Sequence, residues 1–191
     1  MKTSLLKKYG LQKWFDNTFD VAEKRILISA YPDFTDDEAV FNSSYAASFL
    51  ANSLMWYNKK DNAVICMKVI SKILELLNDT ADISAYELHF IYLPMIQTLY
   101  KNRDFENAFD LAIDICNRQI KIAPVVAKEI LSSPFNSIPI LPEHIGFKQL
   151  AIIEKKNKNW LRVIELCKIA KSQGWDGNWD KRIDEARKNL K

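Results

Sequence analysis

Histidine-based catalysis or metal binding would have to be centred on His89 or His144, the two histidines of the chain. Glu87 lies two residues before His89, and on a helix that spacing points the two side chains to different sides. Glu143 is adjacent to His144 and offers no better geometry. Without a third ligand nearby, metal-assisted hydrolysis has no support. We therefore expect both histidines to be surface or partly buried residues, with no metal site.

Cysteine chemistry would depend on Cys66, Cys116 and Cys167, which stand 50 and 51 residues apart. Metal sites place two cysteines a few residues apart, and no pair here has that spacing. Each of the three lies in an apolar stripe of a predicted helix, where burial disfavours the reactive thiolate. They are expected to be small buried residues of a reduced, cytoplasmic protein that has no cofactor.

Carboxylates gather at Asp33, Asp36, Asp37 and Glu38, which could suggest a cation site. The cluster lacks the glycine and the ligand order of a calcium loop, so helix capping explains it better. No glycine-rich phosphate loop, nucleophile elbow or dinucleotide fingerprint is present in the sequence. The residue types and spacings therefore predict no catalytic residues and a protein that is not an enzyme.

Composition indicates which elements hold these residues. Four glycines in 191 residues leave few positions for hairpin turns, which favours an all-helical fold. A hydrophobic content of 48% excludes a disordered chain. The length fits one domain, 1–191, that would bury roughly 70% of its unfolded surface. No run approaches the ~18 apolar residues of a membrane helix, and the amino terminus lacks a signal-peptide core, so no membrane association is expected.

Three stretches can be laid over one another as the same helix–turn–helix unit. Each begins with an apolar stripe, breaks at a short polar turn, and resumes with a second stripe that has a small residue near its start. Helix pairs that cannot bury their faces alone must stack on neighbours. The stretches are residues 48–77, 93–122 and 148–173.

Capping residues predict the helix boundaries in the first half. Residues 1–30 contain two or three short helices, which would form an amino-terminal cap over residues 1–40. Thr35 and Glu38 resemble a capping box that opens a helix ending near Asn58. Asp61 is the expected cap of its partner helix.

The next helices follow from a second capping box, Ser84 with Glu87. The helix that it opens should end near Asn102, and Pro94 inside it should kink it or mark a late start. Asp104 is the expected cap of the following helix.

Prolines interrupt the second half. Four of them between 124 and 142 rule out one long helix there, so we expect a helix that stops before Pro124, a short helical piece at 125–131 and an extended loop. Pro142 would lie in the first turn of the next helix. The last helix pair should end at Gly174, and residues 176–191 should form a capping helix over the last repeat.

The repeats resemble tetratricopeptide repeats over roughly residues 45–175. In that family a large apolar residue of the first helix precedes a small one, and another small residue opens the second helix. The inter-repeat separations of 45 and 55 residues exceed the family's period of 34, so the resemblance is to a divergent member. The matching residues are Leu150-Ala151, Trp160, Val163 and Ala170 in the third repeat, Met95-Ile96, Phe105, Ala108 and Ala112 in the second, and Leu50-Ala51, Ala63 and Ile70 in the first.

The resemblance implies an all-α, α-α superhelix of about eight or nine helices. Three tetratricopeptide-like hairpins would occupy residues 41–175, with a proline-rich loop at 124–142. A plain helical bundle without true repeats is the alternative.

In that family the first helices line a concave groove that holds a peptide or a helix. The resemblance therefore implies a non-enzymatic adaptor that binds a protein or peptide. Asn52 and Gln97 would hydrogen-bond a bound backbone, Trp56 would supply apolar contact, and the lysines would attract an acidic partner. A clamp for a peptide carboxylate is not expected, because Ser48 replaces its lysine. The groove positions are Ser48, Asn52, Trp56, Gln97, Lys101, Lys148, Ile152 and Lys156.

Charge asymmetry supports two further alternatives. Residues 144–191 have 12 Lys and Arg against 6 Asp and Glu, whereas residues 1–143 have 15 against 18. An inhibitor or immunity-type protein could cover a partner's surface with the acidic portion. A nucleic-acid-binding regulator could use the basic end, with Trp160 and Trp179 stacking on bases. Mixed charges make a solvated surface the better interpretation of that end. A second copy could also cover an exposed apolar edge, as a homodimer.

Overall fold

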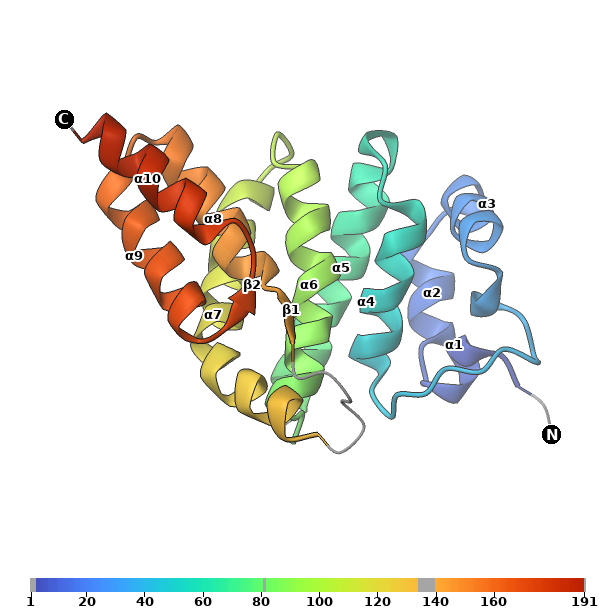
Figure 1. Ribbon diagram of the computed structural model, residues 1–191. Helices are drawn as coiled ribbons and strands as arrows, with labels where there is room; N and C mark the ends of the chain where they lie inside the picture. The colour runs from blue at the N-terminus through green and yellow to red at the C-terminus, as the bar shows by residue number, and fades with distance from the viewer. Residues whose placement is uncertain (1–2, 81, 134–139, 191) are drawn as a thin grey trace. The chain divides into compact units, whose positions relative to one another are not determined.

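The computed structural model describes residues 3–80, 82–133 and 140–190. Ten α-helices and two short 3₁₀-helices make up most of this part of the chain, together with one pair of short strands (Figure 1). The predicted all-α class is confirmed. The chain separates into two compact units, an amino-terminal unit, Met1–Phe109, and a carboxy-terminal unit, Asp110–Lys191. The single domain and the superhelix stay predictions, and each unit is described by itself.

The amino-terminal unit begins with three short helices, as predicted: α1 (Leu5–Lys8), α2 (Gln12–Thr18) and α3 (Val21–Ala30). Gly10 lies between α1 and α2 with φ of +69°, a left-handed backbone conformation that residues with a side chain rarely adopt. A 3₁₀-helix, η1 (Pro32–Phe34), follows α3. Phe34 lies with its ring centroid 5.7 Å from Phe15 and 5.5 Å from Phe49, so an aromatic core joins these helices to the next one.

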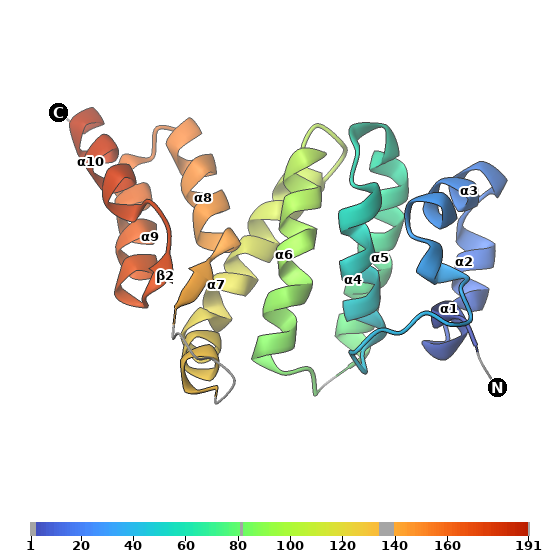
Figure 2. The same cartoon turned by 45° about the vertical axis from the view of Figure 1, so that its right-hand side comes forward.

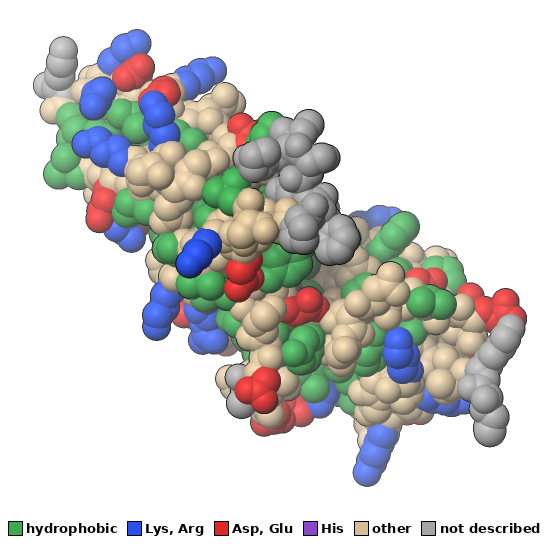
Figure 3. Space-filling view, turned by 60° about the horizontal axis from the view of Figure 1, so that its bottom comes forward, with side chains coloured by type: hydrophobic (Ala, Val, Ile, Leu, Met, Phe, Trp, Pro, Cys, Tyr) green, Lys and Arg blue, Asp and Glu red, His purple; other side chains and the backbone are tan. Residues whose placement is uncertain are grey.

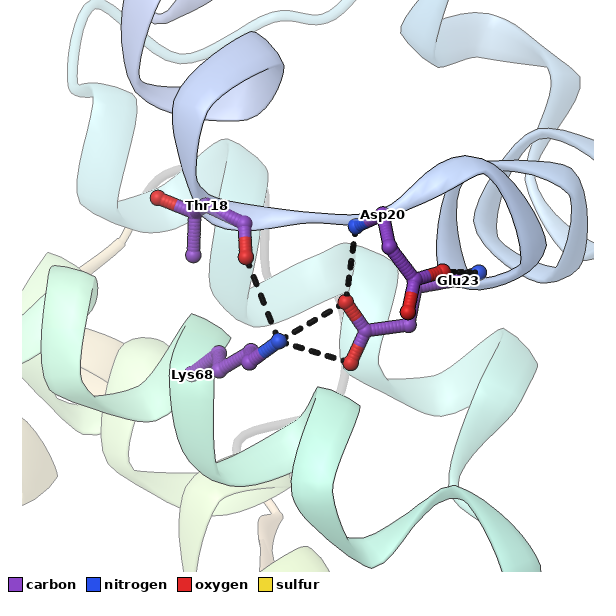
Figure 4. Close-up of polar contacts among 4 residues, drawn as sticks. All are labelled: Thr18, Asp20, Glu23 and Lys68. Carbon is purple, nitrogen blue, oxygen red and sulfur yellow. Dashed lines mark hydrogen bonds and ion pairs between the residues drawn. The ribbon is translucent and has the colours of Figure 1, made fainter.

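A polar network holds the start of α3 against α5 (Ala63–Asp79), as Figure 4 shows. Asp20 caps α3 by accepting from the Glu23 backbone N–H at 2.8 Å, and Glu23 accepts from the Asp20 N–H at 3.0 Å. Lys68 of α5 donates to both carboxylate oxygens of Glu23 at 2.7 Å and to the Thr18 carbonyl at 3.2 Å. One lysine therefore connects the end of α2, the start of α3 and the middle of α5.

The centre of this unit consists of α4 (Ala46–Tyr57), a 3₁₀-helix η2 (Lys60–Asn62), α5 and α6 (Ala85–Lys101). Helix α4 packs against both α5 and α6. The predicted helix ends are confirmed, because Asn58 and Asn102 are the C-caps of α4 and α6. Apolar side chains from all three helices form the buried core: Leu50, Leu54, Ile70, Ile73, Met95 and Leu99.

Two predicted helix starts in this unit are wrong. The Thr35 box opens no helix: Asp36 Oδ1 accepts from the Glu38 backbone N–H at 2.8 Å, a local turn that competes with helix formation. Residues 40–43 form no regular secondary structure, and the Ser43 carbonyl accepts from the Tyr9 hydroxyl at 2.6 Å. Helix α4 therefore begins only at Ala46. Asp61 lies inside η2, which moves the N-cap of α5 one residue on, to Asn62.

The carboxy-terminal unit contains most of α7 (Ala108–Ser132), then α8 (Ile145–Lys156), α9 (Trp160–Ser172) and α10 (Trp179–Asn189). Helix α9 packs against α8 and α10. Short strands β1 (Leu141–Glu143) and β2 (Trp175–Asp176) pair in parallel. The predicted terminal helix is confirmed, and its apolar residues Trp179, Ile183 and Ala186 are buried.

The prediction that a helix stops before Pro124 is wrong, since α7 continues to Ser132. Proline inside a helix removes one backbone hydrogen bond. Here Ala123, Val126 and Ala127 are buried on either side of it, and their burial offsets that loss. Residues 124–132 of the expected loop are therefore helical, and residues 134–139 lie outside the described residues.

Two capping predictions near these helices are also wrong. Asp104 does not open α7, because backbone bonds from Phe105 to Asn102 (2.8 Å) and from Ala108 to Phe105 (3.1 Å) form a turn first. Pro142 lies in β1 instead of a helix, and α8 begins three residues later, after His144.

Candidate functional site

An apolar pocket of about 310 Å³ lies between α4 and α6 in the amino-terminal unit, where the two helices run side by side (Figure 2). Its volume falls at the lower end of the ~300–1,000 Å³ of ligand pockets. Six of its lining side chains are apolar and come from α4, α6 and the irregular segment before α4: Phe41, Met55, Phe90, Ile91, Leu93 and Pro94.

Large apolar side chains beside this pocket are open to solvent. Met55 is 56% exposed, Phe90 43% and Trp56 58%. The Trp56 ring lies 5.9 Å from that of Tyr31, which supports one side of it, and Phe90 lies 4.8 Å from the ring of Tyr86. Figure 3 views the side on which α4 and α6 begin and shows apolar side chains reaching the surface among charged ones. Exposed apolar groups gathered around a hollow are typical of an interaction site.

Three polar side chains complete the pocket lining: Ser48 and Asn52 of α4 and Glu87 of α6. Glu87 Oε1 accepts hydrogen bonds from the Ser48 and Ser43 hydroxyls, each at 2.5 Å. The predicted capping box is therefore only half formed: the Ser84 hydroxyl accepts from the Glu87 N–H at 3.1 Å, whereas the Glu87 carboxylate turns toward the serines.

Two tyrosines form hydrogen bonds next to these polar groups. Tyr9 donates to the Ser43 carbonyl at 2.6 Å and stacks on Phe49 with centroids 5.2 Å apart. Burial and the nearby Glu87 charge raise the pKa of Tyr9, so its hydroxyl stays a donor. Asn52 Nδ2 donates to the Tyr31 hydroxyl at 3.2 Å. The polar side of the pocket is thus held in one orientation.

The structure brings together some of the predicted groove residues of this unit. Ser48 and Asn52 line the pocket, and Trp56 follows one turn later on α4. Gln97 is exposed on α6, three residues after Pro94 and so on the same helix face. Lys101 lies apart: it lines a different cavity of about 230 Å³, and its ammonium donates to the Asn58 carbonyl.

The remaining predicted groove residues, Lys148, Ile152 and Lys156, share one face of α8 in the carboxy-terminal unit. Lys148 forms an ion pair with Glu143 at 2.6 Å, Ile152 is half-buried and Lys156 is exposed. A groove that continues through both units stays a prediction.

Some of the charges at the basic end of the carboxy-terminal unit are paired. Ion pairs join Lys155 to Glu185 at 2.5 Å and Lys171 to Asp180 at 2.7 Å. Trp179 is buried and donates its indole N–H to the Trp175 carbonyl, so it is held in the core away from any base. These contacts favour a solvated surface over a nucleic-acid site.

The prediction of surface or partly buried histidines is wrong. His89 is buried, with its ring 5.2 Å from Phe90, and burial lowers its pKa to about 4. His144 is buried too: its Nδ1 accepts from the Phe147 N–H at 3.3 Å at the start of α8, and its ring lies 4.7 Å from Trp175. Both lie beside aromatic rings, and an isolated histidine in a sequence does not indicate whether it is buried.

The cysteines are buried and free, as predicted. Burial raises the pKa of Cys66 and Cys116 to about 12, and that of Cys167 to about 11. Over residues 3–80, 82–133 and 140–190, no group of three or more His, Cys, Asp or Glu side chains is placed to hold a metal ion. None of the helices in these ranges has both the length and the apolar character needed to cross a membrane.

Comparisons with protein-family models, with curated proteins and with solved structures give no match. The resemblance to tetratricopeptide repeats therefore stays a prediction from the sequence.

Sequence reasoning missed Met55, Phe90 and Glu87 as lining residues. Their spacing offered a signal. Met55 follows Asn52 by three residues, and Phe90 follows Glu87 by three, so each pair shares a helix face. The sequence did not show that α4 packs against α6, and this packing brings the two faces to one pocket.

Proposed function

We propose that the amino-terminal unit is a non-enzymatic module that binds a peptide segment of a partner protein in the pocket between α4 and α6. The observation that supports this most directly is the pocket itself, with exposed Met55, Trp56 and Phe90 beside it. An apolar side chain of the partner would fill the pocket and bury these three. Buried apolar anchors supply most of the binding energy in such interfaces.

Polar groups would fix the bound segment. Asn52 uses its amide nitrogen on Tyr31, which leaves its amide oxygen to accept a backbone N–H of the peptide. Gln97 would make a similar bond further along α6. In this proposal α4 and α6 are the first helices of the first two tetratricopeptide-like repeats, and the pocket is part of the groove that those helices line in a superhelix.

The test is selection of a random phage-displayed peptide library on the purified full-length chain. Met55→Asp places a charge in the pocket and should abolish binding of the enriched peptides. Val21→Asp is the matched control, because Val21 is 77% exposed on α3 and does not line the pocket. We expect enriched peptides with a large apolar residue that bind wild type and Val21→Asp but not Met55→Asp. Failure to enrich any peptide, or equal binding by Met55→Asp, would contradict the proposal.

A further inference from the structure

We infer that the bound peptide segment is cationic, and that it presents a lysine or arginine to Glu87 beside the apolar side chain that fills the pocket. This inference rests on the proposed function. It gives the partner a charge opposite to the one that the lysines of the sequence suggested.

Among the described residues that line the pocket, Glu87 is the one with a charge. Its Oε1 accepts both serine hydroxyls, whereas Oε2 accepts no hydrogen bond from any residue that the structure describes. Within the same residues no lysine or arginine forms an ion pair with it. A carboxylate offers about four lone-pair sites, so two remain for a ligand.

The surroundings of this carboxylate strengthen its interaction with a cation. Phe90 and Met55 line the same pocket, and a bound apolar side chain would displace water from it. Charges attract more strongly where water is excluded, and a charged N–H donor to a carboxylate is among the strongest hydrogen bonds. An acidic peptide would meet repulsion at the same place. The pocket thus favours a basic segment over an acidic one.

Geometry leaves the choice between lysine and arginine open, because one N–H donor to Oε2 is enough. The two serine hydroxyls hold Oε1 in place, so the cation would meet a partly preorganised acceptor. The serine hydroxyls are neutral, so the negative charge of Glu87 is left for a cation of the partner to neutralise.

The experiment uses the peptides enriched on wild type and measures their affinity by calorimetry. Glu87→Gln keeps a carbonyl oxygen for the two serines and removes the charge. Glu106→Gln, an exposed residue of the same unit, is the matched control. In each enriched peptide, the lysine or arginine is replaced by methionine. We expect this replacement to weaken binding to wild type and to Glu106→Gln by at least about tenfold, and to change binding to Glu87→Gln much less.

Two results would overturn the inference alone. Enriched peptides that need Met55 but contain no lysine or arginine would leave the pocket as a peptide site and remove its charge preference. An equal loss on wild type and Glu87→Gln would place the cation elsewhere. If instead the peptides bind Met55→Asp as well as wild type, the proposed function fails together with the inference. Circular dichroism of each variant is the control that its fold is retained.

Discussion

Ser48 donates a hydrogen bond to Glu87 across 2.5 Å, and this contact joins α4 to the first turn of α6 at the polar side of the pocket. The same carboxylate oxygen accepts a hydrogen bond from the Ser43 hydroxyl, so the irregular segment before α4 is bound at the same point. A residue that an isolated helix would use as its own cap thus holds three pieces of the chain together. Its other oxygen accepts no hydrogen bond from the residues that the structure describes.

Ser48→Ala should lower the free energy of unfolding by about 1–3 kcal/mol, because it removes a hydrogen bond to a charged acceptor from a buried position. Ser44→Ala, at an exposed neighbouring position, should change it by less than about 0.5 kcal/mol. Urea denaturation followed by circular dichroism measures both. Equal small effects for the two variants would show that the Ser48 bond contributes nothing to stability.

Lys68→Met should destabilise the amino-terminal unit by about 1–3 kcal/mol. Its ammonium lies between Glu23 and the Thr18 carbonyl, and the Glu23 side chain is only 14% exposed (Figure 4). Lys60→Met is the control, since Lys60 and Asp104 are both well exposed and 3.8 Å apart, and such pairs contribute little. Denaturant melts of the two variants should therefore differ, and coincident melts would contradict the role given to Lys68.

The three thiols should resist alkylation in the folded protein. Because burial raises the pKa of Cys66 and Cys116 to about 12 and of Cys167 to about 11, almost no thiolate is present at pH 8. Mass spectrometry after brief iodoacetamide treatment should find no modified cysteine in the native chain and three in the denatured chain. Rapid labelling of any one without denaturant would show that its helix opens readily.

His89 should make stability depend on pH. Its pKa is lowered to about 4 in the folded chain, so the folded state resists a proton that the unfolded state accepts near pH 6.5. Above pH 6.5 His89 is neutral in both states and the free energy of unfolding is unaffected. As the pH falls from 6.5 toward 4, protonation of the unfolded state lowers the free energy of unfolding by up to about 3 kcal/mol. Urea melts across this window should show a steeper loss for wild type than for His89→Gln. Parallel curves would mean that His89 titrates normally when folded.

Local signals in the sequence predicted many of the helices, because caps and apolar periodicity act over a few residues. Asn58, Asn102 and the helix after Asn178 show this. The predictions failed for two kinds of reason. At Thr35 and Asp104 a local turn competes with the helix start. At Pro124 burial of the flanking residues allows α7 to continue, and the Tyr9 hydroxyl bonds residue 43 in the irregular segment that precedes α4.

The candidate site was predictable in the same partial way. Ser48 and Asn52 were identified from a repeat pattern on α4. Glu87 was assigned to a cap, because its alternative partners lie 39 and 44 residues away in the sequence. Local spacing cannot show which of two hydrogen-bond partners a side chain takes when the second arrives through tertiary packing.

The most direct test of the account is amide chemical-shift mapping by nuclear magnetic resonance, with an enriched cationic peptide titrated into the isotope-labelled full-length chain. We predict that the largest shifts fall on α4 and α6 around Ser48, Asn52, Met55, Glu87 and Phe90, and that they vanish in Met55→Asp. Shifts confined to residues 110–191, or spread without reference to this pocket, would contradict peptide binding between α4 and α6.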